Sequence, residues 1–166
     1  MAPSPAPAKN PSGLVGAIAI AALVAGTLDY TAACINSLVN GRDPALIALY
    51  IASSLLGRET AYAGGWGMMA FGIFLHYVIA TTWTVLFFLG YPRVPLLRKN
   101  AALVGVAYGL FVWAVMNQVL VPLTRIKTGV FALNSVAMIQ AGILVICIGL
   151  PIALLARRHY RKTAGV

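Results

Sequence analysis

The sequence predicts an all-α membrane protein with four transmembrane helices and one short helix at the outer membrane surface. The 166-residue chain is 61% hydrophobic and 9% charged, whereas soluble domains carry about 25% charged residues. A helix that crosses the hydrocarbon layer needs about 20 mostly apolar residues, and four stretches reach this length. These stretches are residues 12–39, 64–90, 100–123 and 129–156.

The first span follows a Pro- and Ala-rich segment, "MAPSPAPAKNPS", at residues 1–12. This composition is typical of a disordered tail, because it offers few large apolar side chains to bury. We therefore expect a transmembrane domain over residues 13–157, followed by a basic cytoplasmic tail at residues 158–166.

A shorter apolar segment, "DPALIALYIASSLLG", separates the first two spans at residues 43–57. Asp43 suits a helix N-cap, Pro44 suits the first helical position, and Gly57 favours a helix stop. The segment reaches only about 20 Å at 1.5 Å per residue, which is too short to cross. We expect an interfacial helix packed over the bundle, and a re-entrant path is the alternative that the sequence leaves open.

Lysine and arginine positions predict the orientation of the spans. One side carries eight of them, namely Lys9, Arg93, Arg98, Lys99, Arg157, Arg158, Arg161 and Lys162. The other side carries four, namely Arg42, Arg58, Arg125 and Lys127. Cytoplasmic loops carry the excess of basic residues, so both termini are expected in the cytoplasm and the short helix outside. The net charge of +9 thus indicates topology and not nucleic-acid binding, because these residues punctuate the apolar segments.

With this topology, the polar residues inside the spans fall in the outer half of the membrane or near its middle. Because lipid offers no hydrogen-bond partner, such side chains point inward and satisfy one another. The sequence therefore predicts a polar pocket in the outer half of the bundle. Its expected residues are Asp29, Asn36, His76, Asn117, Gln118, Asn134 and Gln140.

Asp29 is the least expected of these residues, since a carboxylate in hydrocarbon costs a few kcal/mol. Within the spans, only His76 could place a positive charge beside it. One reading is a proton-linked or cation-binding site formed by Asp29 and His76. The other is structural: Asp29 caps or bonds neighbouring helices, and His76 bonds a carbonyl or a threonine. Both readings stay open at this point.

The residue types argue against a cofactor, a metal site or catalysis. Haem ligation by two histidines needs rings at one depth, but His76 lies within a span and His159 lies beyond the end of another. No three zinc ligands cluster. Cys34 and Cys147 are at different depths, so we expect neither a disulfide nor a metal pair. We expect no cofactor and no enzymatic activity.

Small residues recur at helical spacing in the first and third spans. Ala17, Ala21 and Ala25 follow one another at every fourth position, as do Gly105 and Gly109 in "GVAYG". This spacing lets helix backbones approach closely. We expect close packing within the bundle in preference to dimerisation through these faces.

Four segments together resemble a group of small bacterial inner-membrane proteins related to the YagU-like family. The segments are "YIASSLLGRETAYAGG", "GIFLHYVIATTW", "YPRVPLLRKN" and "GVAYGLFVWAVMNQVLVPLTR". The shared scheme is a glycine-rich entry to the second span, a histidine within it, a Pro-containing turn and a third span ending in Asn and Pro. The resemblance implies a multi-pass protein of the bacterial inner membrane and leaves the activity open.

Three classes of function compete on this evidence. The first is an accessory or structural subunit of a larger membrane complex, which the lack of a catalytic motif favours. The alternative is a small-molecule or proton-coupled transporter that uses the pocket around Asp29 and His76. A membrane enzyme or cofactor carrier ranks last. The expected partners are membrane lipids and either a larger membrane complex or further copies of the chain, with no nucleic acid.

Overall fold

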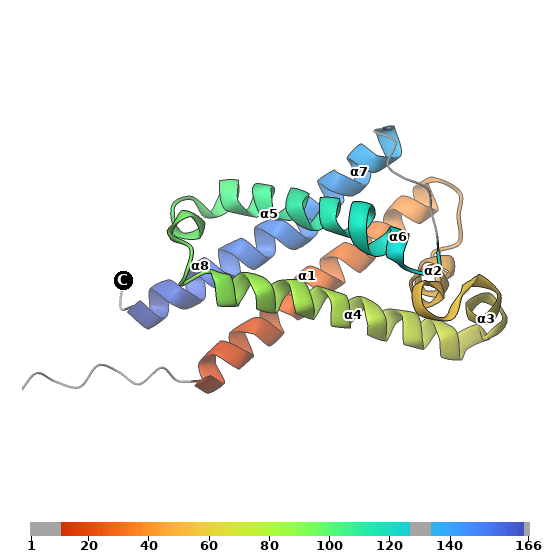
Figure 1. Ribbon diagram of the computed structural model, residues 1–166, viewed down its shortest axis with the longest axis horizontal. Helices are drawn as coiled ribbons and strands as arrows, with labels where there is room; N and C mark the ends of the chain where they lie inside the picture. Colours follow the sequence, from red (N-terminus) through yellow and green to blue (C-terminus); the bar gives the residue numbers. More distant parts are fainter. Residues whose placement is uncertain (1–10, 127–133, 165–166) are drawn as a thin grey trace, which may run out of the picture.

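A computed structural model describes residues 11–126 and 134–164, and all regular structure in these two ranges is helical (Figure 1). The α-helices are α1 (Pro11–Val39), α2 (Ala45–Leu56), α3 (Arg58–Ala63), α4 (Gly65–Gly90), α5 (Ala101–Val115), α6 (Val121–Leu123), α7 (Ser135–Leu144) and α8 (Leu150–Ala164). A 3₁₀ turn, η1 (Pro95–Arg98), precedes α5, and two π-helical turns, η2 (Met116–Leu120) and η3 (Val145–Gly149), join α5 to α6 and α7 to α8. Most of the predicted disordered tail, and the predicted start of the fourth span at residue 129, lie outside the described residues.

Four helices are long and apolar enough to cross a membrane, which confirms the predicted fold class. They cover Gly13–Val39, Gly65–Gly90, Ala101–Leu123 and Ser135–Thr163, and the shorter apolar helix is Ala45–Leu56. The last helix runs further than expected, since α8 continues to Ala164 and takes in the segment that we predicted as a basic tail from residue 158. The segment is therefore helical through most of its length.

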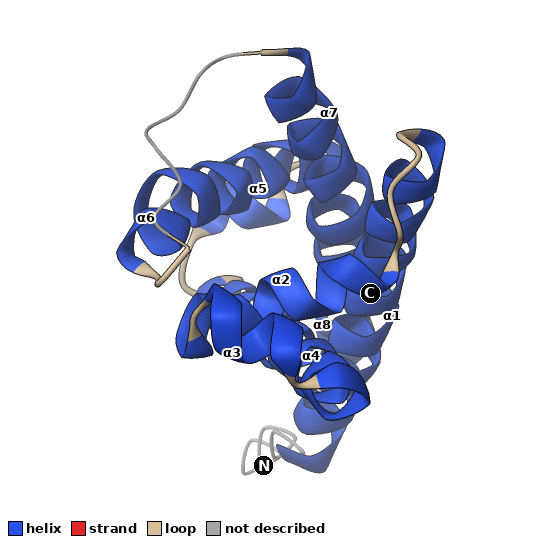
Figure 2. Cartoon of the chain, turned by 90° about the vertical axis from the view of Figure 1, so that its right-hand side faces the viewer, coloured by secondary structure: helices blue, strands red, loops and turns tan. Residues whose placement is uncertain are grey.

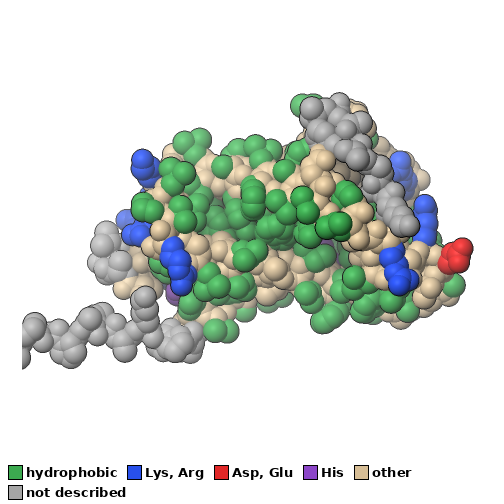
Figure 3. All heavy atoms as spheres, in the orientation of Figure 1, with side chains coloured by type: hydrophobic (Ala, Val, Ile, Leu, Met, Phe, Trp, Pro, Cys, Tyr) green, Lys and Arg blue, Asp and Glu red, His purple; other side chains and the backbone are tan. Residues whose placement is uncertain are grey.

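The surface has the polarity of a multi-pass membrane protein. Lys and Arg side chains gather at the two ends of the long axis, and hydrophobic side chains cover the band between them (Figure 3). Each span contributes large exposed apolar side chains to this band, among them Leu23 at 58%, Phe74 at 62%, Leu103 at 68% and Ile146 at 64% exposure. Hydrocarbon is the environment in which such a surface is stable, because water would disfavour a continuous apolar band.

Glycines set the closest approach between the helices. Gly105 and Gly109 of α5 pack directly on η3, where a Cβ on Gly149 would collide with the Gly105 carbonyl oxygen and lie 2.7 Å from the Gly109 nitrogen. The Gly105 and Gly109 pair therefore brings two helix backbones together within the chain. Gly72 of α4 likewise lets α2 approach closely, since a Cβ on Gly72 would collide with the backbone carbonyl of Ala48.

One end of the bundle is closed by aromatic rings, and we call it the aromatic end; it is where α4 ends, α5 begins and α8 ends (Figure 1). The Tyr91 and Tyr160 rings stack with centroids 4.9 Å apart, and the Phe87 and Tyr108 rings meet edge to face at 4.7 Å. Tyr108 donates its hydroxyl to the Trp83 carbonyl at 2.6 Å, and Tyr160 donates to the carbonyl of Phe88 at 2.8 Å. These bonds tie α5 and α8 to α4.

The opposite end carries α2 and α3. The Asp43 side chain accepts the Ala45 amide at 2.9 Å, so it caps the start of α2 as its sequence position suggests. Gly57, at φ +87°, ends α2 and starts α3, a short helix that we did not predict. Figure 2 looks onto this end, with α2 and α3 on one side and α6 and α7 on the other.

Candidate functional site

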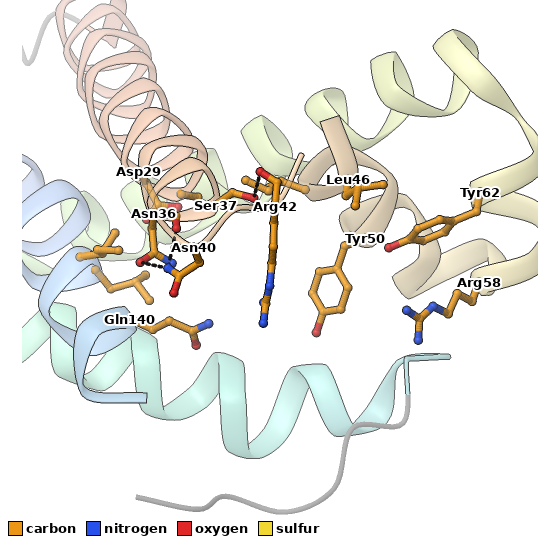
Figure 4. A pocket seen from close by; sticks show the side chains of 14 residues that line it. Asp29, Asn36, Ser37, Asn40, Arg42, Leu46, Tyr50, Arg58, Tyr62 and Gln140 are labelled. Atoms are coloured by element: carbon orange, nitrogen blue, oxygen red, sulfur yellow. Dashed lines mark hydrogen bonds between the residues drawn. The ribbon is translucent and has the colours of Figure 1, made fainter. Parts of the chain in front are cut away.

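A pocket of about 660 Å³ lies at the end of the bundle that carries α2 and α3, and we call this the pocket end. Its walls come from α1, from the turn after α1, and from α2, α3 and α7 (Figure 4). The lining residues are Asp29, Ala33, Asn36, Ser37, Asn40, Arg42, Leu46, Ile47, Tyr50, Arg58, Tyr62, Gln140, Ile143 and Leu144. The volume lies within the range of roughly 300–1,000 Å³ typical of small-molecule sites.

Helix α1 supplies one polar wall. Asp29, Asn36 and Asn40 recur at seven- and eleven-residue offsets, which places them on one face of the helix. Asn40, the first residue after α1, donates its side-chain amide to the Asn36 backbone carbonyl at 2.7 Å, so this pair bonds across the last turn of α1. Gln140 of α7 contributes its side chain from another wall (Figure 4).

Two arginines supply most of the charge. Arg42 and Arg58 both line the pocket, and Asp29 is the single carboxylate among its described lining residues. With all three ionised, the lining carries one excess positive charge. In Figure 4, the polar ends of Arg42, Tyr50 and Gln140 turn toward the same side of the pocket, and Asp29 lies away from them on α1.

His76 is held by the backbone of α1 and is not among the pocket-lining residues. Its Nε2 lies 2.8 Å from the carbonyl oxygen of Gly26. Because a carbonyl only accepts, Nε2 carries the hydrogen and donates it. Tyr30 and Tyr77 flank the ring, with centroids 5.3 and 5.6 Å away. The bond to the Gly26 carbonyl matches the structural reading of His76.

Only some of the seven residues that were predicted to share a pocket line it in the structure. Asp29, Asn36 and Gln140 line the pocket, and His76 lies against α1 behind Gly26. The remaining three are elsewhere: Asn117 donates to the Trp113 carbonyl of its own helix at 2.9 Å, Gln118 is exposed, and Asn134 caps α7 by accepting the Ala137 amide at 2.9 Å. A similar depth in the membrane does not bring side chains together, because it does not fix the direction in which a helix presents each of them.

Two of the lining arginines, Arg42 and Arg58, were interpreted from the sequence only as topology signals. Arg42, Arg58 and Tyr62 flank the short helix, and that helix covers the end of the bundle. The short helix expected over the bundle at residues 43–57 thus brings the side chains that flank it into the site.

Metal and thiol chemistry find little support in the described parts of the chain. Among residues 11–126 and 134–164, no three His, Cys, Asp or Glu side chains group closely enough to hold a metal ion. Cys34 and Cys147 are free thiols. His159 lies at the aromatic end, beside the rings of Phe88 and Tyr160.

No family model matches the chain, and no curated protein or solved structure is detectably similar to it.

Proposed function

We propose that this chain binds a small solute in the pocket and carries it across the membrane in a proton-linked manner. The observation that carries the proposal is the contrast along the bundle axis. A pocket of about 660 Å³ lies at one end, and interlocked aromatic rings fill the other. A carrier needs such a state, in which the binding site is reached from one side while the other side is closed.

Asp29 and His76 are two ionisable side chains near the pocket. Asp29 lines the pocket, and His76 of α4 lies against α1, with its Nε2 2.8 Å from the carbonyl oxygen of Gly26. Ionisable side chains inside a membrane bundle commonly mark proton or substrate pathways, because burying them without a purpose is costly. In this proposal Asp29, which lines the pocket, is the group that exchanges the proton as the solute binds.

Two π-helical turns support movement of the helices around the pocket. η2 interrupts the third span and η3 the fourth. Single π-turns inside α-helices are frequently found at functional sites. Both turns lie in the spans that join the pocket end to the aromatic end.

For the orientation we propose both termini in the cytoplasm of a bacterial cell, which turns the pocket outward. The supporting observation is the eight-to-four distribution of lysines and arginines between the two sides. In this arrangement the aromatic end closes the cytoplasmic side of the bacterial inner membrane.

The experiment measures solute-driven proton movement in liposomes loaded with pyranine. Probes are L-amino acids, mono- and dicarboxylates, inorganic phosphate and ethidium. We expect at least one probe to shift the internal pH, and Asp29→Asn to abolish the shift. Asp43→Asn is the matched control, because Asp43 caps α2 and does not line the pocket. Equal fluxes for wild type and Asp29→Asn, or no flux with any probe, would overturn the proposal.

The competing proposal is an accessory subunit of a larger membrane complex. Its support is the wide exposed apolar band, which fits a partner helix as well as lipid. Purification in mild detergent separates the two. An accessory subunit would elute with other proteins at fixed stoichiometry, whereas a carrier would elute alone or with further copies of itself.

A further inference from the structure

We propose that the pocket binds an organic anion, whose carboxylate or phosphate group lies against Arg42 and Arg58 and whose apolar part lies against α2 and α7. The inference rests on the proposed use of this pocket as the solute site, and it names the chemical class of the solute. The two arginines belong to similar tripeptides, "GRD" at residues 41–43 and "GRE" at residues 57–59.

Each tripeptide lies at a junction between two helices. Gly41 and Gly57 adopt φ angles of +66° and +87°, which glycine reaches without a steric penalty. The arginine follows directly. The acidic residue comes next: Asp43 caps the start of α2, and Glu59 is the second residue of α3. The helix boundaries thus place one arginine at each end of α2.

The position of Arg42 is fixed by hydrogen bonds of the backbone. The Gly41 amide donates to the Leu38 carbonyl and the Arg42 amide to the Ser37 carbonyl, both at 2.9 Å. These two bonds with a left-handed glycine form a Schellman motif. Ser37 also donates its hydroxyl to the Arg42 carbonyl at 3.3 Å. The backbone from which the Arg42 side chain extends into the pocket is therefore held in place.

Arg58 is held by an aromatic ring. Its guanidinium carbon lies 5.5 Å from the centroid of the Tyr62 ring, one helical turn away. Contact with the face of a ring orients the guanidinium plane and leaves its N–H edges available to an acceptor. Carboxylates and phosphates are the acceptors that match this geometry.

The remaining lining fits an organic body and not a bare ion. Leu46, Ile47, Ile143 and Leu144 line the same pocket from α2 and α7. Asp29 lies on α1, across the pocket from Arg58 in Figure 4, so an acidic group near the arginines is kept away from the carboxylate. A cation would meet two guanidinium groups instead, which disfavours it.

The same anion chemistry has two sources, a soluble organic acid and the head group of an anionic lipid. Hexyl phosphate is the soluble probe, phosphatidylglycerol the lipid probe, and hexyltrimethylammonium the cationic control with a matched apolar part. The full chain is studied in phosphatidylcholine nanodiscs as wild type, Arg42→Gln, Arg58→Gln, the double variant, and Arg125→Gln. Arg125 carries the same charge near Gly57 but does not line the pocket.

We expect hexyl phosphate to bind wild type and Arg125→Gln alike, and the double variant at least about tenfold more weakly, which corresponds to roughly 1.4 kcal/mol. In nanodiscs containing phosphatidylglycerol, native mass spectrometry reports whether that lipid stays bound in an arginine-dependent way. Arginine-dependent binding of either probe supports the anion class and identifies its source. The thermal unfolding midpoint without ligand establishes that each variant is folded.

Three results would overturn the inference: neither anion binds wild type, both bind the double variant as well as wild type, or the cation binds more tightly than hexyl phosphate. Its failure is separable from that of the proposed function. Proton-linked flux of ethidium that is unchanged in the double variant would retain the carrier and reject the anion. Arginine-dependent anion binding without any proton movement would instead retain the anion site and reject the proton-linked carrier.

Discussion

The two ends of this bundle are formed by different sets of helices, and their polar side chains bond in different ways. At the aromatic end, the hydroxyls of Tyr108 and Tyr160 cross between helices and bind backbone carbonyls of α4. At the pocket end, Asn40 bonds to Asn36 one turn before it, and Arg58 contacts Tyr62 one turn away. The two tyrosines thus join helices at the aromatic end, whereas these pocket-end side chains bond to neighbours in their own segment.

This difference implies that the two ends of the bundle axis contribute differently to stability and to binding. Cross-helix bonds and rings exclude water and lipid, so the aromatic end has a dense core with Phe88 fully buried. Polar side chains with local partners keep donors and acceptors facing the pocket. The aromatic end therefore carries more of the bundle's stability, and the pocket end carries the ligand chemistry. The following substitutions test this division, from the largest expected effect to the smallest.

Phe88→Ala is expected to have the largest effect. Phe88 is 0% exposed and contacts the rings of His159 and Tyr160. Removing a buried aromatic ring lowers the free energy of unfolding by about 3–5 kcal/mol. Leu86→Ala in the same helix, at 54% exposure, is the control and is expected to change little. Unfolding in mixed micelles measures both, and equal losses would mean that the aromatic end has no packed core.

Gly72→Ala tests how α2 is held over the pocket. The added methyl group would collide with the backbone carbonyl of Ala48, which cannot rotate away as a side chain can. We expect a loss of about 1–3 kcal/mol in the free energy of unfolding. Gly67→Ala lies in the same helix with nothing within 4 Å of the new methyl group. It should be neutral or gain up to about 1 kcal/mol through helix propensity. A harmless Gly72→Ala would show that α2 is not docked on α4.

Tyr108→Phe removes only a hydroxyl and sharpens the comparison of the two ends. The lost bond to the Trp83 carbonyl, at 2.6 Å, joins α5 to α4. We expect a cost of about 1 kcal/mol in the same unfolding assay. Tyr62→Phe removes a hydroxyl at the pocket end, where Tyr62 is 37% exposed, and should have a smaller effect. A larger loss of stability for Tyr62→Phe than for Tyr108→Phe would contradict the structural role of the aromatic end.

Asn36→Ala and Gln140→Ala are expected to have the smallest effect on stability, within about 0.5 kcal/mol. Both side chains line the pocket, and Gln140 is exposed. Their effect should appear instead in the binding of hexyl phosphate, because the lining loses polar groups. A large loss of stability in either variant would show that the pocket end is also a structural element.

The spans and the short helix were predictable because their signals are local. An apolar run long enough to cross identifies each span, and the Asp43–Pro44 start and the Gly57 stop mark the short helix within two residues of its bounds at Ala45–Leu56. The π-helical turns and α3 were not predicted. No local residue signal distinguishes a π-turn from the α-helix around it, and six residues are too few for a periodic pattern.

The site was predictable in depth but not in direction. Asp29, Asn36 and Gln140 were expected in a pocket, and they line one. Asn117 and Asn134 share the expected depth range, yet each bonds within or at the start of its own helix. The rotation of a helix about its axis depends on contacts between helices, such as those of Gly105 with η3, which a single sequence does not display.

The most direct test compares water access at the two ends in nanodiscs. In a chain with Cys34 and Cys147 replaced by serine, Ala33→Cys places a thiol in the pocket lining and Ala153→Cys places one in the core, at 1% exposure. A charged methanethiosulfonate reagent should modify Ala33→Cys rapidly and Ala153→Cys slowly, and hexyl phosphate should protect the first thiol alone. Equal rates at the two positions would contradict a hydrated pocket at one end of a closed bundle.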